Sequence, residues 1–233
     1  MDIQNKNRKL LKKNHVYDET MEHDACGVGL VASTEGLKSR KVVEYGIEAL
    51  KAVWHRGAID ADGKTGDGAG IHIEIPNDFF AEKIEITGHE HDNSDLCVGM
   101  IFLPRNDFGG QEQCRSIVES ELTKKNFNIY GWRQVPVDPS VLGEKAEQTR
   151  PEITQVLFTH NDKSIHGKDL ERALYETRRK IEKEALRNQL NNFYICSFSS
   201  KSIIYKGMFL AESLSDFYPD LKDERFISRY AIF

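Results

Sequence analysis

Short apolar stretches and helical patterns alternate along the chain. Residues 1–24 are polar and charged without a period, which is typical of a mobile tail. The pattern changes at Ala25, after which the glycine-punctuated segment 26–32 predicts a buried strand. Ser39 then predicts the N-cap of a helix that continues to about Trp54, because apolar residues recur after it at helical spacing.

The other elements follow from the same two periods. We expect strands at 71–75, 96–103, 154–159, 193–197, 203–205 and 226–233, and helices at 111–125 and 168–190. In the longest helix Leu170, Leu174, Ile181 and Leu186 share one side, and charged residues lie opposite. Trp54 and Trp132 are interpreted as packing anchors. The strands gather towards both ends of the chain, so the predicted fold class is α+β.

The segment 226–233 predicts a strand that is still in progress at the last residue, without a cap or turn. We therefore expect the sequence to be a truncated piece of a longer domain.

Composition excludes several classes of function. The 32 basic and 37 acidic residues give a net charge of −5, which offers no electrostatic basis for binding nucleic acid. No apolar run approaches the ~18 residues of a membrane span. The basic residues near the N-terminus are not followed by an apolar segment, so a secretory signal is not expected.

The four cysteines are far apart and include no Cys-x-x-Cys pair; they are Cys26, Cys97, Cys114 and Cys196. This spacing fits neither a disulfide framework nor a zinc site, so we expect a cytoplasmic protein without a bound metal. Cys97, Cys114 and Cys196 fall in predicted regular elements and are interpreted as core or surface thiols.

The loop Asp60–Gly70 is rich in glycine and aspartate. It lacks the glycine and glutamate positions of an EF-hand, and the first glycine of a P-loop is one residue out of place. A turn-rich connector is one interpretation. The other starts from Arg56 and Gly57 just before it, because an arginine fixed there has the planar fork that grips a carboxylate.

Cys26 also has two interpretations. It is either a small buried residue of a strand or a catalytic nucleophile. Cleavage between Ala25 and Cys26 would give the cysteine a free α-amino group, which titrates near ~7.7–8.0. That amine can accept the proton of the neighbouring thiol, so one residue would supply both nucleophile and base.

Three stretches carry a family resemblance: Asp24–Gly29, Trp54–Ala58 and Asp60–Gly70. They closely resemble the start of glutamate synthase large subunits, which is a class II glutamine amidotransferase domain. Other class II amidotransferases share the cysteine and the arginine-glycine pair but not the glycine-aspartate loop. Later segments look like the same family, at 130–137, 193–197, 205–208 and 217–221. The likeness extends from about Tyr17 to the last residue.

The resemblance implies an N-terminal-nucleophile hydrolase fold, a four-layer αββα sandwich that is incomplete here. It implies a propeptide at 1–25 and an amidotransferase domain at 26–233. Cys26 would attack the side-chain amide of L-glutamine, release ammonia and form a γ-glutamyl thioester that water hydrolyses to glutamate. By position Arg56, with Gly57, would bind the substrate α-carboxylate, and Asp67 and Gly68 lie in the matching loop.

The departure from the family lies at the C-terminal end. The family continues into a histidine-x-arginine segment and an asparagine-glycine pair that forms the oxyanion hole, and these are absent from the sequence. Loss of one oxyanion donor costs on the order of 10²–10³ in rate. We therefore expect little or no activity from this piece alone.

Two classes of function stay open. One is a glutaminase module that supplies ammonia to 2-oxoglutarate; the other is a non-catalytic fragment or a split subunit that needs a partner chain. The resemblance implies FMN and an iron–sulfur cluster in the parent enzyme but no cofactor in this segment. It also implies the rest of the large subunit as a partner, with a small electron-donating subunit or ferredoxin, and NADPH, NADH or ferredoxin as electron donor.

Overall fold

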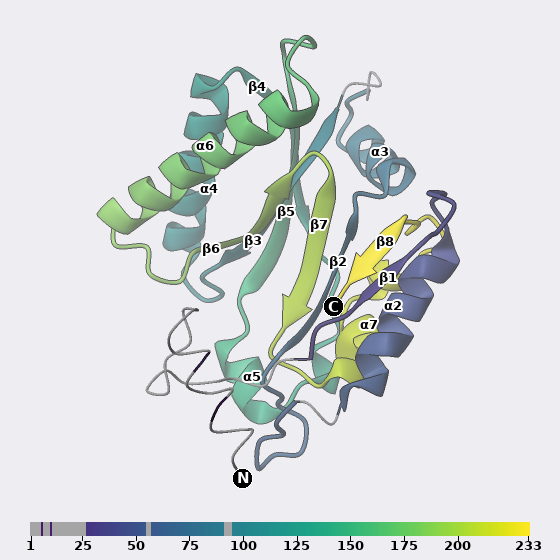
Figure 1. Cartoon of the computed structure of the whole chain (residues 1–233). Helices are drawn as coiled ribbons and strands as arrows, with labels where there is room; N and C mark the ends of the chain where they lie inside the picture. Colours follow the sequence, from purple (N-terminus) through teal and green to yellow (C-terminus); the bar gives the residue numbers. More distant parts are fainter. Residues whose placement is uncertain (1–5, 7–9, 11–26, 55–56, 91–94) are drawn as a thin grey trace.

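The computed structural model describes residues 27–54, 57–90 and 95–233, together with Lys6 and Leu10. Two antiparallel four-stranded sheets organise this part of the chain (Figure 1). The first sheet has the order β1-β8-β2-β7, and its strands are β1 (Leu30–Ala32), β8 (Tyr230–Ile232), β2 (Ala69–Glu74) and β7 (Ser202–Gly207). The second sheet has the order β4-β5-β3-β6, and its strands are β4 (Phe127–Gln134), β5 (Glu152–His160), β3 (Leu96–Leu103) and β6 (Tyr194–Ser199). These sheets, with the helices around them, confirm the α+β class.

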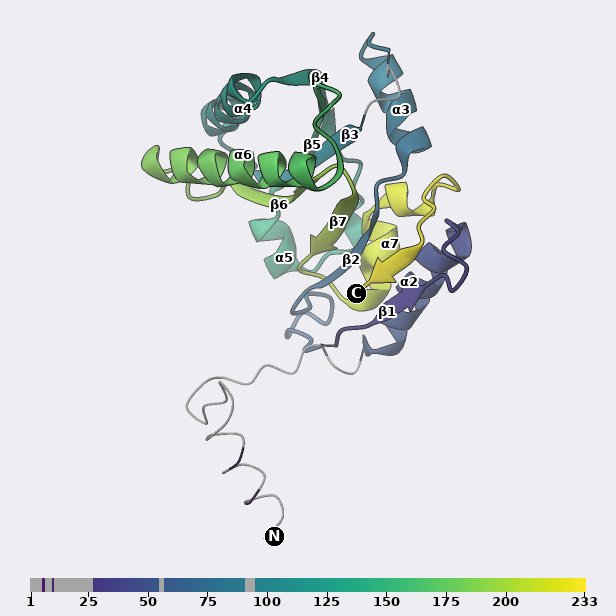
Figure 2. The same cartoon turned by 45° about the horizontal axis from the view of Figure 1, so that its top comes forward.

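The helices lie in separate groups around the two sheets (Figures 1 and 2). They are α2 (Arg40–Ala52), α3 (Asn77–Ile86), α4 (Phe108–Lys124), α5 (Glu144–Thr149), α6 (Gly167–Arg187) and α7 (Leu214–Phe217). Helices α4 and α6 pack together beside the second sheet, whereas α2 packs against the strands β1, β8 and β2. Each sheet therefore has its own helical cover.

The second sheet has an apolar core on its helix side. Val156 and Phe158 of β5 are fully buried there, against Val118 of α4 and Leu174 of α6. Residues of a strand point alternately to the two faces, so the next positions contribute to a different core. Leu157 joins the larger core, which also contains residues of α2 and of the first sheet.

A buried polar network joins the two sheets. Arg133 of β4 makes two hydrogen bonds to Asp220, of 2.6 and 2.8 Å, and a third to the Gln155 side chain at 2.8 Å. The hydroxyl of Tyr205 on β7 donates to Asp220 at 3.0 Å and accepts from Gln155 at 3.1 Å. Gln155 and Asp220 are almost completely buried, and the hydrogen bonds of this network supply the partners that buried polar groups require.

The structure confirms Ser39 as the cap of the predicted helix, but the predicted C-terminal end of that helix is wrong. Ser39 precedes α2, and its side chain accepts from the Val42 amide at 3.4 Å. The helix ends at Ala52, before the predicted Trp54. Because Trp54 lies beyond the helix, it leaves the apolar stripe, and it is 62% exposed instead of acting as a packing anchor.

Other boundaries also differ from the sequence prediction. The strands predicted at 26–32 and 226–233 contain only three residues each, β1 and β8. Helix α6 ends at Arg187, and Leu186, predicted on its apolar side, is 73% exposed in its last turn. The strand β4 and the helices α3 and α5 were not predicted. The predicted tail at 1–24 falls, apart from Lys6 and Leu10, outside the described residues.

Candidate active site

Two cavities open on the same short stretch of chain, at the start of β2. Their volumes are about 1210 and 780 Å³. The residues that line both are Gly27, Leu50, Asp67, Gly68, Ala69 and Phe209. Gly27 is the residue after Cys26 in the sequence. The first described residue of the predicted domain and the glycine-aspartate loop therefore meet at one place.

The loop before β2 folds back on itself as a narrow turn. A bridge pairs Ile59 with Gly66, and the amide of Asp60 donates to the carbonyl of Thr65 at 2.8 Å. The amide of Gly63 donates to the Asp60 carbonyl at 2.9 Å, which tightens the reversal. The loop Asp60–Gly70 therefore forms the turn-rich connector that its composition suggested, and part of it lines the smaller cavity.

Asp67 closes the base of this loop. Its carboxylate oxygen Oδ2 accepts a hydrogen bond from the amide of Ala58 at 2.9 Å. Ala58 directly follows Arg56 and Gly57 in the sequence, so Asp67 is bonded to the segment that the family resemblance assigns to carboxylate binding. The next residue, Gly68, has φ of 129°, a conformation that favours glycine because a side chain would clash there. The chain can therefore turn from the loop directly into β2.

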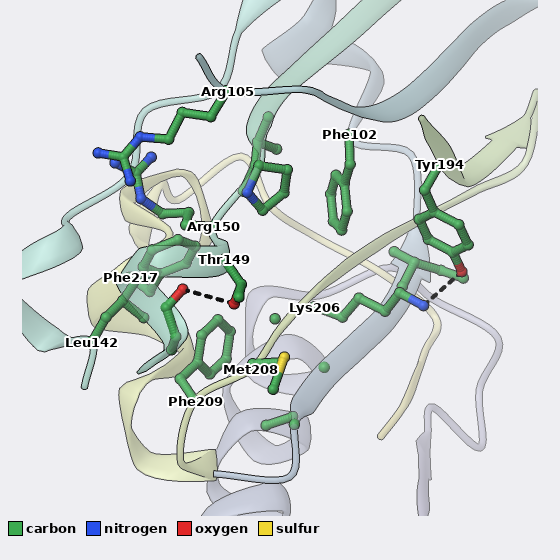
Figure 3. A pocket seen from close by; sticks show the side chains of 18 of the residues that line it. Phe102, Arg105, Leu142, Thr149, Arg150, Tyr194, Lys206, Met208, Phe209 and Phe217 are labelled. Carbon is green, nitrogen blue, oxygen red and sulfur yellow. Dashed lines mark hydrogen bonds between the residues drawn. The ribbon is translucent and has the colours of Figure 1, made fainter. Parts of the chain in front are cut away.

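Apolar side chains form most of the wall of the larger cavity (Figure 3). The apolar lining includes Phe102, Leu142, Met208, Phe209 and Phe217. On the other side Lys206 of β7 donates from Nζ to the hydroxyl of Tyr194 on β6 at 2.7 Å, and both line the cavity. The cavity thus combines a broad apolar surface with a few directed polar groups, as ligand and docking sites do.

Two arginines lie side by side at one edge of the larger cavity (Figure 3). Arg105 and Arg150 both pair with Glu147 of α5, at 2.7 Å each. The hydrogen bond from Arg150, followed by that from Arg105, lowers the pKa of the Glu147 carboxyl. Among these three side chains, one negative charge faces two positive charges, so this edge is suited to an acidic group.

His72 reaches the larger cavity from β2. Its ring meets the ring of Tyr230 edge-on, with 5.9 Å between the centroids. Burial lowers the pKa of the imidazole, so the neutral form is favoured at physiological pH. Its Nε2 atom is buried without a hydrogen-bond partner among the described residues. In the sequence, His72 alternates with Ile71 and Ile73 of the strand predicted at 71–75, and this pattern alone indicates no role for it.

The three cysteines that the structure describes are unsuited to nucleophilic chemistry. Cys97, Cys114 and Cys196 are free and buried, so of the two predicted interpretations they are core thiols. Burial raises the pKa of the Cys114 and Cys196 thiols to about 11 and raises that of Cys97 as well. Because the thiolate is the reactive form, these cysteines stay unreactive at neutral pH.

The structure describes only some of the predicted site residues. Ala25, Cys26 and Arg56 lie outside the described residues. Gly57 and the pair Asp67 and Gly68 line the same smaller cavity, although nine residues separate Gly57 from the pair in the sequence. The roles of all these residues remain predictions.

Sequence reasoning missed the contacts between this loop and α5. Asp62 accepts hydrogen bonds from the amides of Lys64 and Thr65, at 3.0 and 2.7 Å. Aspartate followed by glycine is a recognised signal for such a local turn. The contact with α5 is made by the amide of Ala146, which bonds to Thr65 from about eighty residues further along the chain. No short-range pattern reveals it.

Within the described ranges, no three histidine, cysteine or acidic side chains gather in a way that suits a metal ion. Over the same residues, no helix combines the length and the apolar character that crossing a membrane requires.

Residues 26–233 match the family described as glutamine amidotransferases class-II. The chain is also 54% identical over 227 residues to the NADPH glutamate synthase large chain of Azospirillum brasilense, an alignment that covers 97% of this chain and 15% of that one. It is 38% identical over 213 residues to ferredoxin-dependent glutamate synthase 2 of Synechocystis sp., with 91% of this chain and 13% of the relative covered. The chain therefore spans about 15% or less of the length of these relatives.

The chain belongs to the class II glutamine amidotransferases. Within that class, it corresponds to the amidotransferase region at the N-terminal end of glutamate synthase large chains.

Proposed function

We propose that this chain is the glutaminase part of a glutamate synthase, with Cys26 as nucleophile. The observation that carries the proposal is that the family match begins at Cys26, the residue predicted to become the N-terminus after removal of 1–25. The buried state of the three other cysteines supports it, because burial suppresses their thiolate forms.

The proposed reaction uses one residue as both nucleophile and base. The α-amino group of the processed Cys26 takes the thiol proton, and the sulfur attacks the side-chain amide carbon of L-glutamine. Collapse of the tetrahedral intermediate breaks the C–N bond, and the amine returns its proton to the leaving group as ammonia. Water then attacks the γ-glutamyl thioester, again losing a proton to the amine, and releases glutamate and the free thiol.

The smaller cavity is the proposed place for the substrate α-carboxylate. Arg56 would bind this group through its guanidinium fork, with Gly57 beside it. Support comes from Gly27, Gly57, Asp67 and Gly68, which line the same cavity of about 780 Å³. That arrangement would bring the residue after the nucleophile and the residue after the predicted carboxylate ligand to the wall of one cavity.

The proposal extends to the longer protein. Ammonia released here would pass to 2-oxoglutarate elsewhere in the large chain, which would carry FMN and an iron–sulfur cluster outside these residues. The names of the relatives include both NADPH and ferredoxin, so either one is a reasonable electron source for the whole enzyme. We place the enzyme in the cytoplasm and expect the complete domain to form the four-layer αββα sandwich.

A second candidate is a half-site that acts only with further polypeptide. The observation that favours it is the larger cavity, because its 1210 Å³ exceeds the range of about 300–1,000 Å³ usual for small-molecule pockets. Tyr194 and Met208 on its wall are 44% and 47% exposed, so a further segment could still cover them.

The deciding experiment measures ammonia released from L-glutamine by three proteins. They are the chain itself, the chain extended with downstream residues of its parent, and the Cys26→Ala variant of the extended chain. The proposal expects release by the extended protein, loss of release in the variant, and little release by the shorter chain. Undiminished release by the Cys26→Ala variant would remove Cys26 from the mechanism.

A further inference from the structure

The tip of the glycine-aspartate loop is held on α5 by a buried hydroxyl. Thr65 is 2% exposed, and its Oγ1 donates to Asp62 Oδ2 at 2.6 Å. The same oxygen accepts from the amide of Ala146, in the first turn of α5, at 3.4 Å. One hydroxyl therefore links the loop to the helix, and it uses both its donor and an acceptor position.

Asp62 organises the loop side of this contact. Its Oδ1 atom accepts from two loop amides, while Oδ2 accepts from the Thr65 hydroxyl. The hydrogen bond from that hydroxyl is the largest cause of the low pKa of the Asp62 carboxyl, and the two amide bonds add to it. Asp62 is therefore ionised at neutral pH, so it acts as an acceptor at both oxygens.

Close packing completes the contact. Gly143 is the residue before α5, and a Cβ placed on it would lie 2.6 Å from the backbone nitrogen of Thr65. Real Cβ atoms do not approach that closely, so the helix start fits against the loop only because this residue is glycine.

A second contact between the loop and α5 is of a different kind. Lys145 pairs with Asp60 at 2.7 Å, but the lysine side chain is 66% exposed and the aspartate 35%. Exposed pairs of this type contribute little because solvent screens them and the long side chain loses entropy. The buried Thr65 contact and the exposed Lys145 pair thus form a matched comparison on one loop.

We propose that Thr65 and Asp62 are positioning residues for glutamine binding. They fix the loop on α5, and the loop in turn presents Asp67, whose carboxylate accepts from the amide of Ala58, the residue that follows Gly57 in the sequence. This inference rests on the proposed glutaminase function and deepens it. It assigns the affinity of the site for the substrate α-carboxylate to a contact made outside the cavity.

The first test measures hydrogen exchange of the Ala58 amide in the full chain. Thr65→Val keeps the shape and removes the hydroxyl, Thr65→Ser keeps the hydroxyl, and Lys145→Ala breaks the exposed pair. We expect the exchange protection of the Ala58 amide to fall about tenfold in Thr65→Val. Once the loop detaches from α5, the hydrogen bond between Asp67 and the Ala58 amide opens more often. Thr65→Ser and Lys145→Ala should stay within about twofold of the parent. Unchanged protection in Thr65→Val would overturn the proposal.

The second test uses the extended chain and measures alkylation of Cys26 by a glutamine analogue with an electrophilic side chain, over a range of concentrations. We expect Thr65→Val to raise the half-saturating concentration about tenfold and to leave the limiting rate within about twofold, with rescue by Thr65→Ser. If Thr65→Val loses thermal stability but keeps the concentration dependence of labelling of the unsubstituted protein, Thr65 has only a structural role. That result would overturn the inference. If the extended chain without a further substitution is not labelled, the glutaminase proposal fails instead, and hydrogen exchange alone decides whether the loop contact exists.

Discussion

The two sheets of this protein are built for different tasks. The three longest strands of the second sheet have eight or nine residues, and two helices seal one of its faces. In the first sheet β1 and β8 have only three residues each, and Leu30 on β1 is 64% exposed. Both cavities reach this sheet where the glycine-aspartate loop enters β2, and the larger one is also lined by Phe102 and Tyr194 of the second sheet.

This difference separates stability from chemistry. Long strands under a helical cover bury many apolar groups and open only with most of the protein. Short strands next to glycine-rich turns leave room for a substrate and keep backbone groups available. The rigid sheet can hold the residues of a site in position, while the more open sheet leaves space for a substrate. Variants on the two sides should therefore fail in different ways.

The largest effect is expected at the proposed nucleophile. Cys26→Ala should lower ammonia release from glutamine by about 10⁴-fold or more in a catalytically complete protein, because no other group can form the thioester. Cys196→Ala, at a buried thiol of the second sheet, is the control and should keep the activity of whatever fraction remains folded. Ammonia release and thermal unfolding, measured together, separate the two cases. Equal losses of activity would erase the contrast between the sheets.

Core truncation should have the next largest effect. Phe158 of β5 is fully buried, so Phe158→Ala should lower the free energy of unfolding by about 3–5 kcal/mol. The matched change on the first sheet is Leu30→Ala, at a mostly exposed side chain, and it should cost less than about 0.5 kcal/mol. Urea unfolding measures both. A larger loss from Leu30→Ala would mean that the short strands carry the stability.

The buried network between the sheets should come third. Asp220→Ala leaves the Arg133 guanidinium, only 14% exposed, without its carboxylate, and should cost about 3 kcal/mol. Lys222→Ala breaks the nearby exposed pair with Asp216, whose side chains are 58% and 55% exposed, and should cost less than about 0.5 kcal/mol. Equal costs in thermal unfolding would mean that the network does not couple the sheets.

The smallest effect concerns acid. Hydrogen bonding from Arg225 lowers the pKa of the Asp223 carboxyl to about 2, from 3.8. A lowered pKa in the folded state stabilises the protein above pH 3.8, and this contribution disappears as the pH falls through 2. Asp223→Asn should therefore lower stability by about 0.5–1 kcal/mol at pH 7 and by nothing below pH 2, after allowance for solvent screening. A difference that persists below pH 2 in urea unfolding would show another cause.

Much of the scaffold could be predicted from local pattern. The continuous apolar run at 96–103 became β3 with the same bounds, because a strand buried on both faces needs no alternation. Ser39 predicted the start of α2 because its side chain bonds to the amide of Val42, only three positions further on. The end of α2 was wrong because Trp54 keeps the helical spacing while the chain itself has already left the helix.

The missed elements have weak local signals. Strand β4 contains Gly131 with φ of 152° and a shift of register beside it, so its alternation is broken. For the site, the sequence brought attention to Gly57, Asp67 and Gly68, which do line one cavity. The contact of Thr65 with Ala146 joins distant parts of the chain, and only the tertiary fold reveals it.

The most direct measurement is the intact mass of the protein from its native host, taken before and after treatment with the electrophilic glutamine analogue. We expect the mass of a chain that begins at Cys26, followed by the addition of one analogue molecule on that cysteine. A chain that keeps residues 1–25 and still releases ammonia from glutamine at full rate, or an adduct on any other residue, would contradict the proposed mechanism.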